Sequence, residues 1–148
     1  MISDKVGSKM LFFSKISKEL YEQIIEKKAK ECGISKQEAN VLLFFSNNKE
    51  FDKAIDAVTY RGFSKAYVSK ALATLIKRGF VEVSCDSADK RYQRIIILDK
   101  ANPVLSVLKE AQRDYFLSLS EGISDEEFLI HAKIIDKIAE NIKNKMKG

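Results

Sequence analysis

The stretch from Ser64 to Leu98 constrains the fold more than any other part of the chain, because its apolar pattern changes there from helical to strand spacing. Ser64 is a residue type that caps helix N-termini, and Gly79 can end the predicted helix in a left-handed conformation. The apolar face of this helix carries Val68, Leu72, Leu75 and Ile76. Residues 80–83 then alternate as a strand does, and a polar loop leads to a second predicted strand at Gln93–Leu98. The stretch therefore predicts a helix followed by a β-hairpin.

The opposite face of this helix is suited to a groove of DNA, since its side chains are small, hydroxylated or cationic. A shorter helix is expected from about Asp52 through Val58, and Gly62 lies in the turn that separates it from Ser64. Two helices joined by a glycine-containing turn form a helix-turn-helix unit, in which the second helix enters the major groove. The hairpin after this second helix would then be a wing.

This segment resembles the core of the MarR family of winged helix-turn-helix regulators. The resemblance rests on Leu75-Ile76-Lys77-Arg78-Gly79 at the end of the recognition helix and on Asp89-Lys90-Arg91 in the wing loop. It extends over nearly the whole chain in the order of predicted elements. It implies a mostly α fold with a small β-hairpin wing, in which a winged helix-turn-helix core is flanked by N- and C-terminal dimerisation helices. The implied division is residues 1–33 and 101–148 for dimerisation and residues 34–100 for DNA binding.

The segments before the helix-turn-helix unit are expected to be helical. After a loose polar start, a first helix is predicted from about Lys9 to about Cys32. Ser35 and Glu38 match a capping box, which opens a second helix that extends to about Phe45. The apolar residues of this second helix should enter the core of the DNA-binding half, namely Ala39, Leu42, Leu43 and Phe45.

Two more helices are predicted after the wing. Asn102 is the expected cap of the first one, with Pro103 at its first helical position, and the helix runs to about Leu119. Ser124 to Glu127 is a second capping box, which opens the last helix. The first, fifth and sixth helices are amphipathic, and the family resemblance implies that they interleave with those of a second subunit in a two-fold dimer. The sequence leaves an intramolecular bundle open as the alternative.

The excess positive charge coincides with the predicted DNA-reading segment. The whole chain of 148 residues has 26 basic and 21 acidic residues, which gives a net charge of +5. Residues 61–94 contain eight basic and three acidic residues, so this window alone accounts for the excess of five. Such a distribution favours a partner that carries phosphates. A solvated lysine-rich surface is the alternative that charge alone leaves open.

Candidate DNA contacts follow from these elements and from the resemblance. Major-groove contacts are expected from the first half of the recognition helix, that is from Ser64, Lys65, Ala66, Tyr67, Ser69 and Lys70. Contacts with the DNA backbone are expected from Thr59, Arg61 and Lys77. A long lysine of the helix could equally bind a phosphate, and Tyr67 could instead pack on the wing. The wing candidates are Asp89, Lys90, Arg91 and Arg94, and Asp89 is expected to brace the loop by pairing with Arg91 or Arg94.

No constellation of side chains in the sequence suggests an enzyme, a cofactor or a metal site. The glycines do not form a phosphate-binding loop, and His131 is the only histidine and lies far from any candidate nucleophile. A Cys-x-x-Cys motif for structural zinc is also missing. Neither a leader segment nor an apolar run of the roughly 20 residues that a membrane span needs is visible, so a cytoplasmic protein is expected.

The resemblance implies a transcriptional regulator that binds a pseudo-palindromic operator in double-stranded DNA as a homodimer, and a repressor that a small-molecule effector releases. Two alternatives remain. In the first, the same fold senses oxidants through Cys32 or Cys85, although structural roles are favoured because only Lys30 lies near Cys32 to stabilise a thiolate. In the second, the winged unit binds a protein partner and no DNA.

Overall fold

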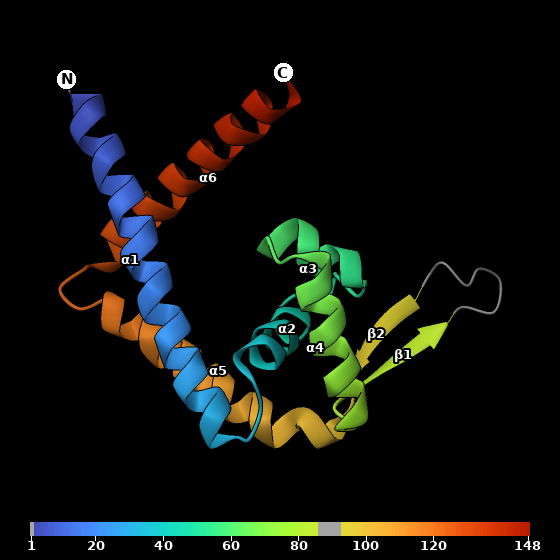
Figure 1. Ribbon diagram of the computed structural model, residues 1–148. Coiled ribbons are helices and arrows are strands. Elements are labelled where there is room, and N and C mark those ends of the chain that lie inside the picture. Colours follow the sequence, from blue (N-terminus) through green and yellow to red (C-terminus); the bar gives the residue numbers. More distant parts are fainter. Residues whose placement is uncertain (1, 86–92) are drawn as a thin grey trace. The chain divides into compact units, whose positions relative to one another are not determined.

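The computed structural model describes residues 2–85 and 93–148, and this part of the chain is mostly helical with one antiparallel hairpin (Figure 1). In chain order the elements are α1 (Ile2–Glu31), α2 (Lys36–Asn47), α3 (Ala54–Arg61), α4 (Lys65–Lys77), β1 (Val81–Cys85), β2 (Gln93–Ile97), a 3-10 turn (Asp99–Ala101), α5 (Asn102–Leu119) and α6 (Asp125–Lys147). The hairpin pairs Val81 with Ile97 and Cys85 with Gln93. The predicted fold class, mostly α with a helix-turn-helix unit and a small hairpin after it, is confirmed.

The contacts divide the chain into two compact units, residues 1–115 and residues 116–148. The first unit holds α1 to α4, the hairpin and most of α5. The second unit holds the end of α5 and all of α6. The candidate DNA-binding residues all belong to the first unit.

Helix α2 lies at the centre of the first unit. Every residue from Glu38 to Ser46 is buried, because α1, α3, α4 and β2 all contact this helix. The four apolar residues of α2 that were predicted to enter the core do so. Their neighbours in the same core come from the surrounding helices and the hairpin and include Ile25, Ala57, Val68, Leu75 and Val81.

Local capping chemistry sets most of the helix ends as predicted. Ser35 forms a complete capping box with Glu38 at the start of α2, and Ser124 forms one with Glu127 at the start of α6. The Ser64 side chain accepts a hydrogen bond from the backbone amide of Tyr67, which caps α4. Gly62, between α3 and α4, has a left-handed φ of 74°.

Two predicted helix starts are wrong. Helix α1 begins at Ile2 instead of near Lys9, so the polar N-terminal residues are helical, and Asp4 in the first turn complements the helix dipole. Asn102 does not cap α5, because its φ of −57° and ψ of −43° are helical. The 3-10 turn before it runs directly into α5, and buried Ala101 anchors this turn in the core.

The first part of α5 is attached to α1 and α2 by polar side chains within the first unit. The Tyr115 hydroxyl donates to the Ser17 carbonyl oxygen at 2.7 Å, and its ring packs edge-on against Tyr21. Gln112 donates to the Tyr21 hydroxyl at 2.7 Å and accepts from the Asn47 side chain at 2.8 Å. These contacts hold α5 beside the middle of α1.

Long apolar faces remain exposed on two helices of the single chain. On α1 the large exposed apolar residues are Val6, Met10, Leu11, Phe12, Phe13, Ile16 and Leu20. On α6, which has no buried residue, they are Phe128, Leu129, Ile130, Ile134, Ile135, Ile142 and Met146. Contiguous apolar surface of this kind is typical of a protein interface.

Candidate nucleic-acid interface

Helix α4 presents a polar and cationic face to solvent, because its apolar residues point into the core. The buried side consists of Val68, Ala71, Leu72 and Leu75. Five of the six residues predicted to face the major groove are exposed, namely Ser64, Lys65, Ala66, Ser69 and Lys70. Lys77 at the end of the helix and Thr59 on α3, both predicted to contact the DNA backbone, are exposed as well. Their exposure leaves all of these side chains accessible to a ligand.

Tyr67, the sixth major-groove candidate, is half-buried and turned toward the core. Its hydroxyl accepts a hydrogen bond from Nδ2 of Asn40 on α2, at 3.2 Å. Its ring stacks on Phe63, with ring centroids 4.7 Å apart and planes inclined by 22°. Among the described residues, the stacking partner of Tyr67 thus belongs to the turn before α4. The spacing of Phe63 and Tyr67, four residues apart across the cap, is the sequence signal that could have indicated this contact.

Arg61 is also engaged within the protein. Its Nη2 lies 3.8 Å from Oε1 of Glu22 on α1, and its guanidinium lies over the Phe63 ring at 4.9 Å from the centroid. A phosphate that bound Arg61 would therefore compete with the Glu22 carboxylate. Sequence reasoning missed Glu22, because no local pattern relates α1 to the end of α3.

The predicted wing residues Asp89, Lys90 and Arg91 lie outside the described residues. Arg94 lies on β2, and its Nε is 3.7 Å from Oδ2 of Asp52, the residue two positions before α3. The backbone amide of Ile95 donates to the Asp52 carbonyl oxygen at 2.6 Å. Asp52 therefore fastens the hairpin to the segment before the helix-turn-helix unit through both its backbone and its side chain.

Arg78 forms an ion pair that sequence reasoning also missed. Its Nε and Nη2 donate to the two carboxylate oxygens of Glu38, which is 4% exposed. Burial by itself raises the pKa of Glu38, but the Arg78 guanidinium and the Ser35 backbone and side chain outweigh it and hold that pKa below its usual range. Arg78 thus fixes the C-terminal end of α4 to the N-terminal end of α2.

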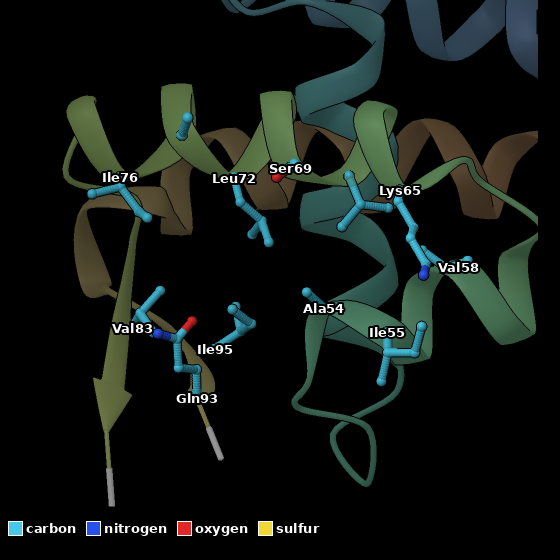
Figure 2. Close-up of a pocket in the computed structure, with 12 residues that line it drawn as sticks. Ala54, Ile55, Val58, Lys65, Ser69, Leu72, Ile76, Val83, Gln93 and Ile95 are labelled. Carbon is cyan, nitrogen blue, oxygen red and sulfur yellow. The ribbon is translucent and has the colours of Figure 1, made fainter. Parts of the chain in front are cut away.

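An apolar groove of about 450 Å³ runs between α3, α4 and the hairpin (Figure 2). Figure 2 shows Ile55 and Val58 on one side, Leu72 and Ile76 above, and Val83 with Ile95 on the hairpin side. Ile76 was predicted to share the buried face of α4, but it lines this open groove and is 44% exposed. Lys65 and Ser69 also line the groove, so its edge adjoins the candidate DNA-contacting face.

The cysteines and the histidine do not assemble a second site in the described residues. Cys32 is half-buried, and burial followed by the Glu31 carboxylate raises the pKa of its thiol, although Lys28 acts in the opposite direction. A raised thiol pKa works against the reactive thiolate that an oxidant sensor needs. Cys85 is exposed on β1, and His131 is exposed on α6. Among residues 2–85 and 93–148, no three metal-binding side chains come together, and no helix is long and apolar enough to span a membrane.

Comparison with known proteins identifies close similarities in fold. A protein from Silicibacter pomeroyi described as a MarR-family transcriptional regulator superposes with a TM-score of 0.79 and 19% identity, covering 90% of this chain and 89% of that one. A MarR-family protein from Listeria monocytogenes, solved in complex with 26mer DNA, superposes with a TM-score of 0.79 and 16% identity, covering 91% and 89%. A MarR protein from Peptoclostridium difficile has a TM-score of 0.75 and 23% identity, covering 92% and 88%.

Sequence comparison also indicates similarity to the MarR family. No curated protein sequence matches the chain significantly. The model of the MarR family matches residues 32–91, which run from the end of α1 across the whole helix-turn-helix unit and β1. Residues 32–91 are thus similar in sequence to the MarR family, and over nine tenths of its length the chain has the winged-helix fold of MarR-family structures.

Proposed function

We propose that this protein is a transcriptional regulator that binds a pseudo-palindromic DNA site as a homodimer, with one α4 helix in each of two major grooves. The observation that carries the proposal is the exposed face of α4, which holds Lys65, Ser69, Lys70 and Lys77 and no acidic side chain. Small and cationic side chains on an exposed recognition helix suit both base edges and phosphates. The Listeria relative that was solved with DNA supports the same function.

The residues divide into two kinds of contact. Lys65, Ser69 and Lys70 lie in the first half of α4, and they contact base edges or nearby phosphates, while Ser64 and Ala66 allow the backbone to approach closely. Thr59 and Lys77 bind the DNA backbone on either side. Lys90 and Arg91 are proposed, from the sequence alone, to reach the flanking minor groove.

The homodimer is proposed because the exposed apolar faces of α1 and α6 need a partner, and a second copy supplies an identical one. Residues 1–33 and 101–148 are the proposed dimerisation segments, and residues 34–100 are the proposed DNA-binding domain. Two copies related by a two-fold axis would place their recognition helices about 34 Å apart, the repeat of the DNA helix. This geometry is the reason for expecting a palindromic site.

Control by a small-molecule effector and action as a repressor, in the cytoplasm, complete the proposal. An effector that binds one spacing of the two α4 helices better than the other would shift the protein toward that spacing. The resulting change in DNA affinity cannot exceed the difference between the effector affinities of the two states. Enzymatic activity forms no part of this mechanism.

The proposal is tested by titrating the protein onto DNA from upstream of its own coding region. Fluorescence anisotropy at several salt concentrations would be compared with a shuffled fragment of equal length. We expect tight, competitor-resistant binding of two subunits per site, with an affinity that falls steeply with salt because counterions are released. Equal affinity for the two fragments would contradict sequence-specific recognition at this site.

A further inference from the structure

A buried side chain joins the long N-terminal helix to the recognition helix. Asn40 on α2 is 2% exposed, and its Nδ2 donates to Oε2 of Glu22 on α1 and to the hydroxyl of Tyr67 on α4, each at 3.2 Å. One amide group therefore connects three helices that are distant in sequence. We call Glu22, Asn40 and Tyr67 the hub.

The burial of Asn40, the central residue of the hub, has a cost in stability. Within the described part of the chain, Oδ1 of Asn40 has no hydrogen-bond partner. An unsatisfied buried acceptor costs about 1–3 kcal/mol, which an apolar side chain of similar volume would avoid. A buried polar side chain of this kind is better explained by the relative placement of the helices that it fixes than by a gain in stability.

A second set of contacts closes a ring around the hub. Glu22 lies 3.8 Å from both Arg61 and Lys36, and Arg61 lies over the ring of Phe63. Phe63 stacks in turn on Tyr67. The ring therefore passes from α1 through α2 to α4 and returns through the turn that precedes α4.

We infer that Asn40 and Tyr67 are positioning residues, which fix the first turns of α4 relative to α1 so that the exposed side chains of α4 meet the DNA in a defined register. This inference rests on the proposed function. Tyr67 lies between Lys65 and Ser69 in sequence, but its hydroxyl is held by Asn40 on the inner side of the helix. Tyr67 therefore acts on recognition through the placement of α4, and it does not read a base itself.

The inference predicts how base recognition changes when the hub is cut. Tyr67→Phe removes only the hydroxyl, and Asn40→Leu removes both donated hydrogen bonds. Both changes remove the Asn40–Tyr67 hydrogen bond that positions α4, so each should weaken operator binding about tenfold, the factor that one ordinary hydrogen bond is worth. Because the whole helix shifts, the loss should be similar on operators that carry single base-pair substitutions. The double variant should bind no worse than Asn40→Leu alone.

The matched control is Tyr115→Phe, which removes a tyrosine hydroxyl that hydrogen-bonds to Ser17 outside the helix-turn-helix unit. It should leave the preference for the operator over the shuffled fragment unchanged. A loss in Tyr67→Phe that is confined to one base-pair position and missing in Asn40→Leu would overturn the inference, since Tyr67 would then read that base. Additive effects of the two substitutions would also overturn it.

A second measurement decides the inference without DNA. Two sets of backbone amides should exchange hydrogen faster in Tyr67→Phe and in Asn40→Leu than in the unmodified protein. They are the amides of residues 66–72 and those of α1 around Glu22. Unchanged exchange in α4 would contradict a positioning role. If the unmodified protein failed to prefer the operator while exchange in the variants rose as expected, the proposed function would fail and the placement of α4 by the hub would stand.

Discussion

Glu38 connects two helix ends with a single buried carboxylate. One oxygen accepts the Ser35 backbone amide at 3.1 Å, which completes the cap of α2, and both oxygens accept from Arg78 at the end of α4. The carboxylate is charged in this setting, since its pKa lies below the ordinary value. The stability of the helix-turn-helix unit should therefore depend on the ionisation of Glu38.

We expect Glu38→Gln to lower the free energy of unfolding by about 1–3 kcal/mol at pH 7, because it removes the charge that Arg78 requires. A folded-state pKa below the unfolded value means that this contribution is present above about pH 4.3, the ordinary pKa of a glutamate. It is lost as the pH falls through the folded-state pKa. Urea unfolding at pH 7 and in the acid range should therefore show the variant and the unmodified protein converging in acid.

The control for this measurement is Glu110→Gln, which removes a carboxylate from the exposed surface of α5. It should change the unfolding free energy by less than about 0.5 kcal/mol. A stability gap between Glu38→Gln and the unmodified protein that stayed constant from neutral to acid pH would contradict the role of the charge.

Lys70 is the residue on which the electrostatic part of the proposal can be tested. Its side chain is exposed in the first half of α4, so we expect Lys70→Ala to weaken DNA binding and to make the log–log salt slope less negative by about 0.9, the loss of one phosphate contact. Anisotropy titrations between low and moderate salt would measure both quantities.

Lys27→Ala, on the exposed side of α1, makes the same change in net charge and should leave the slope unchanged. Equal effects of the two substitutions would mean that only total charge matters.

At the scale of elements, the helix ends were predictable where their chemistry is local. Ser35, Ser64 and Ser124 cap helices as their sequence context indicates, because a cap involves residues only three positions apart. The start of α5 was not predictable in this way. Asn102 and Pro103 have the composition of a helix start, but the burial of Ala101 in the core extends the helical path backward through a 3-10 turn.

The candidate site was predictable to a similar extent. Helical periodicity indicated which residues of α4 face solvent, and Lys65, Ser69 and Lys70 are exposed as expected. The partner of the Tyr67 hydroxyl and the partners of the arginines were not predictable, because those contacts join segments far apart in the chain. The amide that holds Tyr67 comes from α2, and the carboxylate that holds Arg61 comes from α1.

The turn between α3 and α4 offers a test of how backbone conformation sets the helix-turn-helix geometry. Gly62 has a φ of 74°, and a Cβ added there would meet no atom within 4 Å, so the cost of Gly62→Ala is backbone strain alone. We expect a loss of about 1–2 kcal/mol in the free energy of unfolding. Gly7 lies inside α1 with open space around it, so Gly7→Ala should instead raise stability by about 0.5–1 kcal/mol. Thermal unfolding of the two variants would test these opposite signs, and a stabilising Gly62→Ala would contradict the left-handed turn.

At the scale of the whole molecule, the excess positive charge is less available than the sequence suggests. In the described part of the chain, Arg61, Arg78 and Arg94 each face a carboxylate, from Glu22, Glu38 and Asp52 respectively. The lysines of α4 have no such ion pair there, so they supply the positive surface on this helix. The arginines therefore stabilise the first unit, and the proposed function assigns the attraction of DNA to the lysines.

The proposed dimer makes a prediction that links α6 to DNA binding. Phe128, His131, Ile135, Ile138 and Ile142 recur at spacings of three and four residues, which is the pattern of a helix seam that packs against another helix. Ile135 stands at the middle of this series and is 47% exposed in the single chain. Ile135→Glu would place a charge in the buried seam of the dimer, where its desolvation is costly.

We therefore expect the unmodified protein to sediment at twice the 16.8 kDa of one chain and Ile135→Glu to sediment as a monomer at micromolar concentration. Lys133→Glu introduces the same side chain on the opposite side of α6 and should remain dimeric. The monomeric variant keeps an intact α4, so its non-specific DNA binding should persist. Its operator affinity should fall by at least about 100-fold, because a second recognition helix no longer binds in the same event. If Ile135→Glu were monomeric and kept its full operator affinity, DNA recognition would not depend on dimerisation. If the unmodified protein itself sedimented as a monomer, the apolar faces of α1 and α6 would have to bind a different partner.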